Sequence, residues 1–212
     1  MDILTNWFLL MAVFAVALAS PGPDLVMAIR NSLSHGRNAG IWTAVGFGLG
    51  VAVHVTYISL GFAALIASSI MLFTLLKIGG ALYLFYVGFK ALRSQGFTNH
   101  PRFRDMHREG SISPLKAIRQ GFVTNVLNPK ATLFFMAVLS QFITPNAPLW
   151  VYGFYGATCM LMTMGWFSIV ALFLTVPAIR ARFMAISKWV DRTCGAVFIA
   201  LGVKLALTKA TP

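Results

Sequence analysis

Two charged residues stand inside long apolar stretches of the sequence, and each directly follows a proline. Asp24 belongs to residues 20–24 (SPGPD), and Lys130 belongs to residues 128–130 (NPK). A charge at bilayer depth is costly unless it is paired or hydrated, which makes such residues functional candidates. A carboxylate and an ammonium group brought together could bind the two charged ends of a zwitterion.

The prolines break the helices that carry these charges. Pro21 and Pro23 lack a backbone N–H and Gly22 lacks a side chain, so a helix cannot continue through them with its hydrogen bonds intact. Pro129 has the same effect in the second stretch, where Asn128 can both donate to and accept from the exposed backbone. Because lipid cannot satisfy the freed carbonyls, we expect both breaks to face protein or a water-filled cavity. A simple kink that shapes packing is the alternative.

We expect the two breaks to meet, with Lys130 facing a substrate carboxylate and Asp24 facing an ammonium group. The half-helices beginning at Leu25 and Ala131 would add free N–H groups that favour an anion. In the alternative arrangement, Asp24 caps the helix after Pro23 and pairs with Lys130, which holds the breaks together without binding a substrate. The predicted substrate-binding residues are Pro21, Gly22, Pro23, Asp24, Asn128, Pro129 and Lys130.

A few further residues are candidates for proton transfer or for lining a cavity. His54 could carry protons near neutral pH, as could Asp24, although a lone membrane histidine bonded to a neighbour is an equal alternative. Glycines at 46 and 50 open one face of a helix for close packing or for a small ligand. The candidate cavity residues are Gly46, Gly50, Tyr83 and Asn125.

Six apolar stretches carry these residues. Hydrophobic residues make up 58% of the chain and charged residues 10%, against roughly 25% charged residues in a soluble domain, and the mean hydropathy is +0.78. Most stretches reach the roughly 20 residues needed to cross a bilayer. The sequence predicts an all-α integral membrane protein of a single domain, with proline-broken helices 1 and 4. The six predicted transmembrane helices cover residues 3–29, 40–66, 71–89, 121–143, 149–176 and 193–207.

The basic residues predict the orientation of the chain. The net charge is +12, and most of the 17 Lys and Arg lie on the first, third and fifth loops or at their borders. Lys and Arg near helix ends stay on the cytoplasmic side, so these loops are expected inside and both termini in the periplasm. The same charges could also contact anionic lipid. Nucleic acid is not an expected partner, because the basic loop has no aromatic platform for stacking bases.

The two halves of the chain resemble each other. Residues 80–92 and 195–207 both contain Gly-Ala, a short apolar run, Gly and Lys, and the two proline–charge pairs occupy corresponding places. A second three-helix copy must enter from the opposite side of the membrane, which predicts an inverted repeat with the binding site between the copies. The expected parts are repeat one at about 3–93, a cytoplasmic basic loop at about 94–118 and repeat two at about 119–208. Chance recurrence of small apolar residues is the alternative.

These motifs, in this order, resemble the LysE/RhtB family of bacterial amino-acid exporters, and the resemblance covers nearly the whole chain. It implies a transporter rather than an enzyme, without a cofactor, that exports neutral amino acids such as threonine or homoserine across the inner membrane by exchange with protons. Many family members have Asn where this chain has Asp24, and an acidic residue where it has Val51. The motifs that carry the resemblance are residues 21–24, 35–37, 46–50, 80–84, 121–122, 128–131 and 141–142.

Two other function classes remain open from the residues alone. A membrane thiol oxidoreductase would use Cys159 and Cys194, although neither has an adjacent proline. Export of another small solute or of a metal cation is the second alternative, and the sequence supplies few metal ligands for it. The small residues Gly79, Gly80 and Gly88 favour either a homodimer or internal packing.

Overall fold

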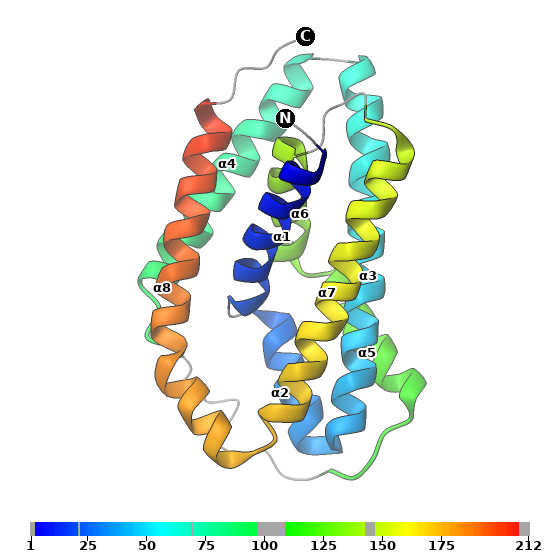
Figure 1. Ribbon diagram of the computed structural model, residues 1–212, viewed down its shortest axis with the longest axis vertical. Coiled ribbons are helices and arrows are strands. Elements are labelled where there is room, and N and C mark those ends of the chain that lie inside the picture. The colour runs from blue at the N-terminus through cyan, green and yellow to red at the C-terminus, as the bar shows by residue number, and fades with distance from the viewer. Residues whose placement is uncertain (1–2, 21, 69, 97–108, 143–146, 208–212) are drawn as a thin grey trace.

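The computed structural model describes residues 3–20, 22–68, 70–96, 109–142 and 147–207, and its regular elements there are all helices (Figure 1). This agrees with the predicted all-α class. The eight helices are α1 (Ile3–Ala19), α2 (Pro23–His35), α3 (Arg37–Ser68), α4 (Ile70–Leu92), α5 (Pro114–Val126), α6 (Pro129–Phe142), α7 (Leu149–Phe173) and α8 (Pro177–Leu207).

Both predicted helix breaks are present. The chain bends by 58° between α1 and α2 and by 58° between α5 and α6. Pro23 and Pro129 are the first residues of α2 and α6, a position where the missing N–H of proline costs no intrahelical bond. Each proline motif therefore ends one helix and begins the next at an angle.

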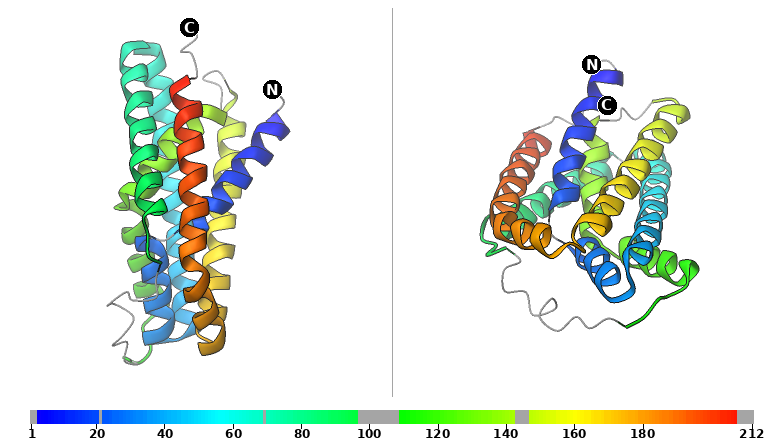
Figure 2. Two further views of the ribbon diagram at one scale, coloured as in Figure 1. Left: turned by 90° about the vertical axis from the view of Figure 1, so that its left-hand side faces the viewer. Right: turned by 60° about the horizontal axis from the view of Figure 1, so that its bottom comes forward.

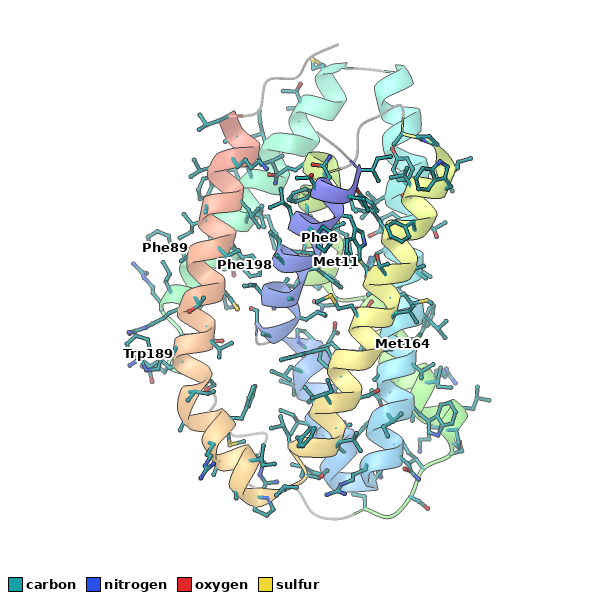
Figure 3. All side chains as sticks on the ribbon, viewed as in Figure 1. Phe8, Met11, Phe89, Met164, Trp189 and Phe198 are labelled. Carbon is teal, nitrogen blue, oxygen red and sulfur yellow. The ribbon has the colours of Figure 1, made fainter. Side chains whose placement is uncertain are left out.

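Two helices of the described chain are long and apolar enough to cross a membrane singly, and they include residues 37–61 of α3 and 149–173 of α7. The number rises to four if each bent pair forms one span. The predicted spans at 71–89 and 193–207 fall in α4 and α8, and their crossing of the membrane stays a prediction. Figure 3 shows Phe89 and Trp189 pointing outward from these two helices, with exposed fractions of 55% and 68%.

Two of the predicted loops are shorter than expected. The fifth was predicted to follow residue 176, with the last helix starting at 193 or borrowing residues from Ile186 onward. Instead α8 begins at Pro177 and carries Arg180, Arg182, Lys188 and Arg192 in its first half. Segment 178–192 contains no glycine or proline, so nothing in it interrupts the helix. The first loop is reduced to Gly36, whose φ of 91° is the left-handed conformation that glycine adopts readily at a helix end.

The helices alternate in direction when each bent pair, α1–α2 and α5–α6, is taken as one unit (Figures 1 and 2). In the first half, α1 and α2 descend in the view of Figure 1, α3 ascends and α4 descends; in the second half, α5 and α6 ascend, α7 descends and α8 ascends. The start of α1 and the end of α8 therefore lie at the same end of the molecule. The starts of α3, α5 and α8 lie at the opposite end.

Two close helix crossings join the halves of the chain. A Cβ added to Gly46 of α3 would lie 2.1 Å from the Ile118 carbonyl oxygen of α5, and one added to Gly121 would lie 2.1 Å from the Thr43 oxygen. Between α4 and α8, a Cβ on Gly195 would come within 2.6 Å of the Gly88 oxygen. Only glycine fits such close backbone contacts. In consequence α3 packs on α5, and α4 packs on α8.

Candidate functional site

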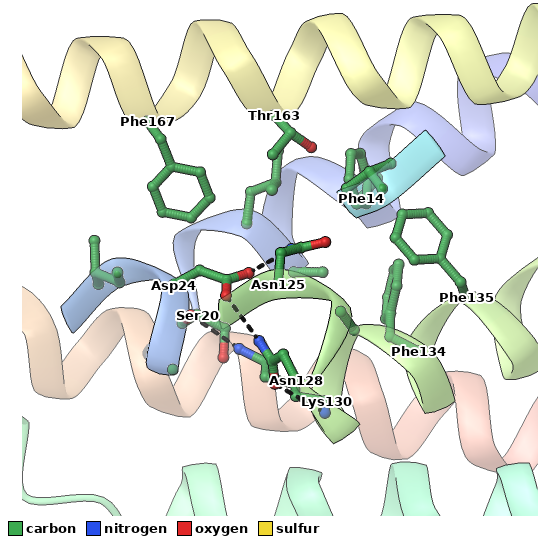
Figure 4. A pocket seen from close by; sticks show the side chains of 16 residues that line it. Phe14, Ser20, Asp24, Asn125, Asn128, Lys130, Phe134, Phe135, Thr163 and Phe167 are labelled. Carbon is green, nitrogen blue, oxygen red and sulfur yellow. Dashed lines mark hydrogen bonds between the residues drawn. The ribbon is translucent and has the colours of Figure 1, made fainter. Parts of the chain in front are cut away.

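The two helix breaks meet, as the sequence predicts, and the Asp24 carboxylate lies between them (Figure 4). Asp24 stands in the first turn of α2. Its Oδ2 accepts a hydrogen bond of 2.7 Å from the amide of Asn125 at the end of α5, and its Oδ1 accepts one of 3.1 Å from the amide of Asn128. Two neutral donors from the second half therefore hold a carboxylate from the first half.

Lys130 makes the reciprocal contact. Its Nζ donates a 2.9 Å hydrogen bond to the carbonyl oxygen of Ser20, which lies in the break between α1 and α2. The same ammonium group lies 5.9 Å from the centre of the Phe198 ring, a cation–π distance. The ammonium group of the second half thus stabilises backbone freed by the break in the first half.

Asn128 connects the two charged residues, as expected from its ability to donate and accept. Its side-chain oxygen accepts from the backbone N–H of Lys130 at 3.0 Å, while its amide nitrogen donates to Asp24. The Asn128 backbone N–H donates to the Asn125 carbonyl at 2.9 Å, which closes the end of α5. The side chain is 4% exposed, so these bonds form away from bulk water.

A small pocket of about 50 Å³ lies beside these groups. Since one water molecule needs about 10 to 15 Å³ of such volume, the pocket has room for a few waters. Aromatic rings close one side of it and polar groups the other, and Figure 4 shows Phe167 and Thr163 reaching into it from α7. The labelled lining residues are Phe14, Ser20, Asp24, Asn125, Asn128, Lys130, Phe134, Phe135, Thr163 and Phe167.

A second and larger cavity, of about 930 Å³, lies on the other side of Lys130 between the breaks, α4 and α8. It shares Ser20, Gly22, Asn128 and Lys130 with the small pocket. Predicted binding residues Pro23 and Pro129 line this cavity, as does the predicted cavity residue Tyr83. The sequence does not separate the two cavities, because both draw on the same proline motifs.

His54 and Gly50 position Asn125. His54 is fully buried, with Nε2 3.0 Å from the Asn125 carbonyl oxygen and Nδ1 2.9 Å from the Tyr57 hydroxyl. A Cβ added to Gly50 would lie 2.5 Å from Asn125 Oδ1, so this glycine makes room for the amide. Asn125 lines the small pocket as predicted. The bonded-histidine alternative describes the contacts of His54, and proton transfer by it stays a prediction.

Two other predicted residues differ from expectation or cannot be placed. Gly46 faces the backbone of α5 and, like Gly50, is absent from both cavity linings; its contacts are those of the close-packing alternative, and a role in a cavity stays a prediction. Pro21 lies outside the described residues. Gly22 has an extended backbone with φ of −177° and contributes to both cavities.

Asp191 is not among the site residues predicted from the sequence. Assigned to a loop, this residue is instead 2% exposed within α8, where its Oδ2 accepts a short hydrogen bond from the Ser94 hydroxyl. A usable signal was present, because Ser187, Asp191 and Cys194 follow each other at helical spacing in the sequence. These residues and Phe198 form one buried face of α8. The face is not apparent when residues 177–192 are taken as a loop.

The alternative chemistries gain no support from the described residues. Cys159 and Cys194 are both buried and free, and the Cys194 thiol donates to the carbonyl oxygen of Val16 at 3.1 Å. Within the described part of the chain, no group of three or more His, Cys, Asp or Glu side chains is arranged to hold a metal ion. The contacts of the described residues therefore support neither a thiol oxidoreductase nor a metal exporter.

Comparison with known proteins agrees with the resemblance in the motifs. The chain is 30% identical over 203 residues to a threonine efflux protein of Salmonella typhi, covering 96% of this chain and 98% of that protein. A threonine efflux protein of Escherichia coli (strain K12) is 30% identical over 93% of this chain and 95% of its own length. A homoserine/homoserine lactone efflux protein of Salmonella typhimurium is 24% identical over 96% of this chain and 97% of its own.

No solved structure matches the chain. The family described as LysE type translocator matches residues 15–209, which include both helix breaks and every residue of the small pocket except Phe14. The family match and the alignments with these relatives both span nearly the full length of the chain. The chain therefore belongs to the LysE type translocator family.

Proposed function

We propose that this chain is a secondary transporter that exports small neutral amino acids, of the threonine or homoserine kind, from the cytoplasm across the bacterial inner membrane. The observation that carries the proposal is the reciprocal contact of Asp24 and Lys130 with the opposite helix break. Opposite charges held at two breaks suit the carboxylate and ammonium of an amino acid. The names of the full-length relatives support the choice of substrate.

The proposed architecture is an inverted repeat of two three-span units. Support comes from the order of elements, a broken pair followed by two long helices in each half, and from the opposite directions of corresponding helices in Figure 1. Basic residues gather where α3, α5 and α8 begin, among them Arg37, Lys116 and Arg180. We assign that end to the cytoplasm, because Lys and Arg are retained there. The termini are then periplasmic.

Transport requires the small pocket to enlarge. Its volume of about 50 Å³ suits water, so an amino acid enters only when the two breaks move apart. The substrate carboxylate then replaces the Ser20 carbonyl oxygen at Lys130, and the ammonium binds Asp24. At Lys130 one hydrogen bond is exchanged for another, and at Asp24 the substrate ammonium is the new partner. The partly buried charges of Lys130 and Asp24 therefore keep a partner throughout.

The moving boundary lies between two groups of helices that each contain members of both halves. The glycine crossings fix α3 to α5 and α4 to α8, and α3 also packs against α2 and α7. We therefore place the motion between the pair α4–α8 and the group α2, α3, α5 and α7. The larger cavity lies along this boundary, and the remaining helices α1 and α6 contact both sides.

Proton coupling is assigned to Asp24. A proton arriving from the periplasmic side neutralises the carboxylate, which weakens its contact with the substrate ammonium and favours release. His54 supports this step because it holds the Asn125 carbonyl and thereby positions the Asn125 amide that donates to Asp24.

The proposed partners are the amino acid, protons and the surrounding lipid. A homodimer would use the face around Gly79, where an added Cβ would meet no atom within 4 Å, whereas Gly88 packs internally on α8.

Efflux from proteoliposomes loaded with a mixed amino-acid pool tests the proposed function. We expect threonine- or homoserine-like amino acids to leave selectively, faster than from liposomes without protein. If no amino acid leaves faster than from empty liposomes, the proposed cargo is wrong.

The thiol oxidoreductase alternative predicts a different outcome for the cysteines. Replacing Cys159 and Cys194 together by serine should leave efflux within about twofold of wild type, because a serine at 194 still donates to the Val16 carbonyl. Loss of efflux in a correctly folded double variant would instead give the thiols a functional role.

A further inference from the structure

The larger cavity contains a second buried carboxylate that the proposed transport cycle does not yet use. Asp191 lines this cavity together with Lys130, Lys90 and Arg93. Its side chain is 2% exposed, and its Oδ1 has no hydrogen-bond partner within the described residues. A buried carboxylate oxygen without a partner is costly, so its retention calls for an explanation.

The turn after α4 fixes this carboxylate in place. Ser94 donates its hydroxyl proton to Asp191 Oδ2 and accepts a 3.0 Å hydrogen bond from the backbone N–H of Gly96. Because the hydroxyl is used in both directions, Asp191 is held with one oxygen satisfied and the other without a partner among the described residues. The unpartnered Oδ1 is shielded from solvent, so it accepts from a cation in the cavity only after a local movement of the side chain.

Lys130 stands between the two carboxylates. It interacts electrostatically with Asp24 and with Asp191, and it lines both the small pocket and the larger cavity. A zwitterion with its carboxylate on Lys130 can therefore place its ammonium on either side. On the cavity side the acceptor is Asp191, and on the pocket side it is Asp24.

We propose that Asp191, oriented by Ser94, is a loading subsite that binds the ammonium group of the amino acid arriving from the cytoplasm while Lys130 binds its carboxylate. This inference rests on the proposed export function. Lys90 and Arg93 draw the carboxylate end into the cavity, which opens beside the end of α4. The ammonium then passes from Asp191 to Asp24, with the carboxylate kept on Lys130. The occupant is an α-amino acid, and its free ammonium group is essential.

Sided transport of radiolabelled threonine tests the proposal. In inside-out vesicles, which expose the cytoplasmic face, Asp191→Asn should raise the half-saturating threonine concentration by about tenfold or more, the effect of losing one hydrogen bond to a charged group. Exchange measured from the periplasmic face should keep its half-saturating concentration. Glu109→Gln, which removes an exposed carboxylate paired with His35, is the matched control and should change neither value.

An equal change at both faces, or none at either, would overturn the loading subsite. Asp191→Asn that lowers only the amount of folded protein, with an unchanged half-saturating concentration, would also overturn it and leave Asp191 a purely structural link between α8 and the turn at 94–96. Failure of wild-type protein to transport threonine or any other amino acid is a separate result that refutes the proposed function itself.

Cysteine protection provides a second measurement that does not depend on turnover. Ala91 lines the cavity without joining the Asp191 hydrogen bonds, so Ala91→Cys in a protein lacking Cys159 and Cys194 reports occupancy. Threonine should slow its labelling by a charged thiol reagent added from the cytoplasmic side, whereas 2,3-dihydroxybutanoate, which has a hydroxyl in place of the ammonium, should not. Adding Asp191→Asn should remove the protection. Equal protection with and without Asp191 would contradict the proposal.

Discussion

Neutral amides donate the two hydrogen bonds to the partly buried Asp24 carboxylate. Asn125 and Asn128 each give one hydrogen bond, and Asn128 also orients the backbone of Lys130. Asp24, Asn128 and Lys130 could be identified from the sequence, because a charge or amide beside a proline in an apolar stretch can be recognised without a structure. Asp191 could not be identified from the sequence, because its burial depends on α8 extending back to Pro177 and on the turn at 94–96.

Replacing Asn125 by alanine should remove one of the two amide donors to Asp24. We expect a loss of about 1 to 3 kcal/mol in stability, the cost of leaving a buried acceptor without its partner, together with reduced efflux. Thermal unfolding of the purified protein and efflux from proteoliposomes measure the two effects. Asn38→Ala, at an exposed position on α3, should change neither. Similar behaviour of both variants would show that the amide does not stabilise the site.

The helices are positioned by glycine contacts between the halves of the chain. Close packing at Gly46 and Gly88 was predicted as one alternative, but their partners in α5 and α8 were not. Sequence spacing shows that a helix has a small-residue face, whereas only the three-dimensional arrangement shows which distant backbone meets it. The proline breaks, in contrast, were predictable because proline acts on its own helix.

An alanine at Gly121 should destabilise the crossing of α3 and α5. Its Cβ would lie 2.1 Å from the Thr43 carbonyl oxygen, a distance that the two backbones can relieve only by moving apart. Overpacking of this kind typically costs about 1 to 3 kcal/mol, and we expect a lower melting temperature and less efflux.

Gly165 supplies the control for this substitution. It lies in α7 with no atom within 4 Å of an added Cβ, so Gly165→Ala should leave the melting temperature unchanged or slightly higher. Equal melting temperatures for the Gly121 and Gly165 variants would refute the proposed role of the crossing.

In the proposed function the whole molecule consists of two helix groups, α4 with α8 and α2 with α3, α5 and α7, and both groups contact α1 and α6. The sequence predicted the helical class, both breaks and their meeting point, since these follow from apolar runs and proline positions. It did not predict two cavities of different size on either side of Lys130, because their volumes depend on how α4 and α8 pack against the rest. Nor did it predict that both glycine crossings join opposite halves.

The proposed coupling of export to protons would be a property of this whole assembly, and Asp24→Asn tests it. Asparagine keeps an acceptor oxygen for one of the two neighbouring amides, but it cannot be protonated or bind an ammonium as strongly. We expect residual efflux that no longer depends on an imposed pH gradient, measured in proteoliposomes with the gradient in both directions. Efflux that keeps the wild-type response to the gradient would remove Asp24 from proton coupling.

The most direct test of the account is efflux of a mixed amino-acid pool through wild-type protein, Lys130→Ala and the exposed control Lys116→Ala. The account predicts that Lys130→Ala inserts normally but loses about tenfold or more of the selective efflux, the effect of removing a charge-assisted hydrogen bond to the substrate carboxylate. Lys116→Ala should retain wild-type efflux. Equal selective efflux through wild-type protein and Lys130→Ala would contradict the substrate site at the two helix breaks.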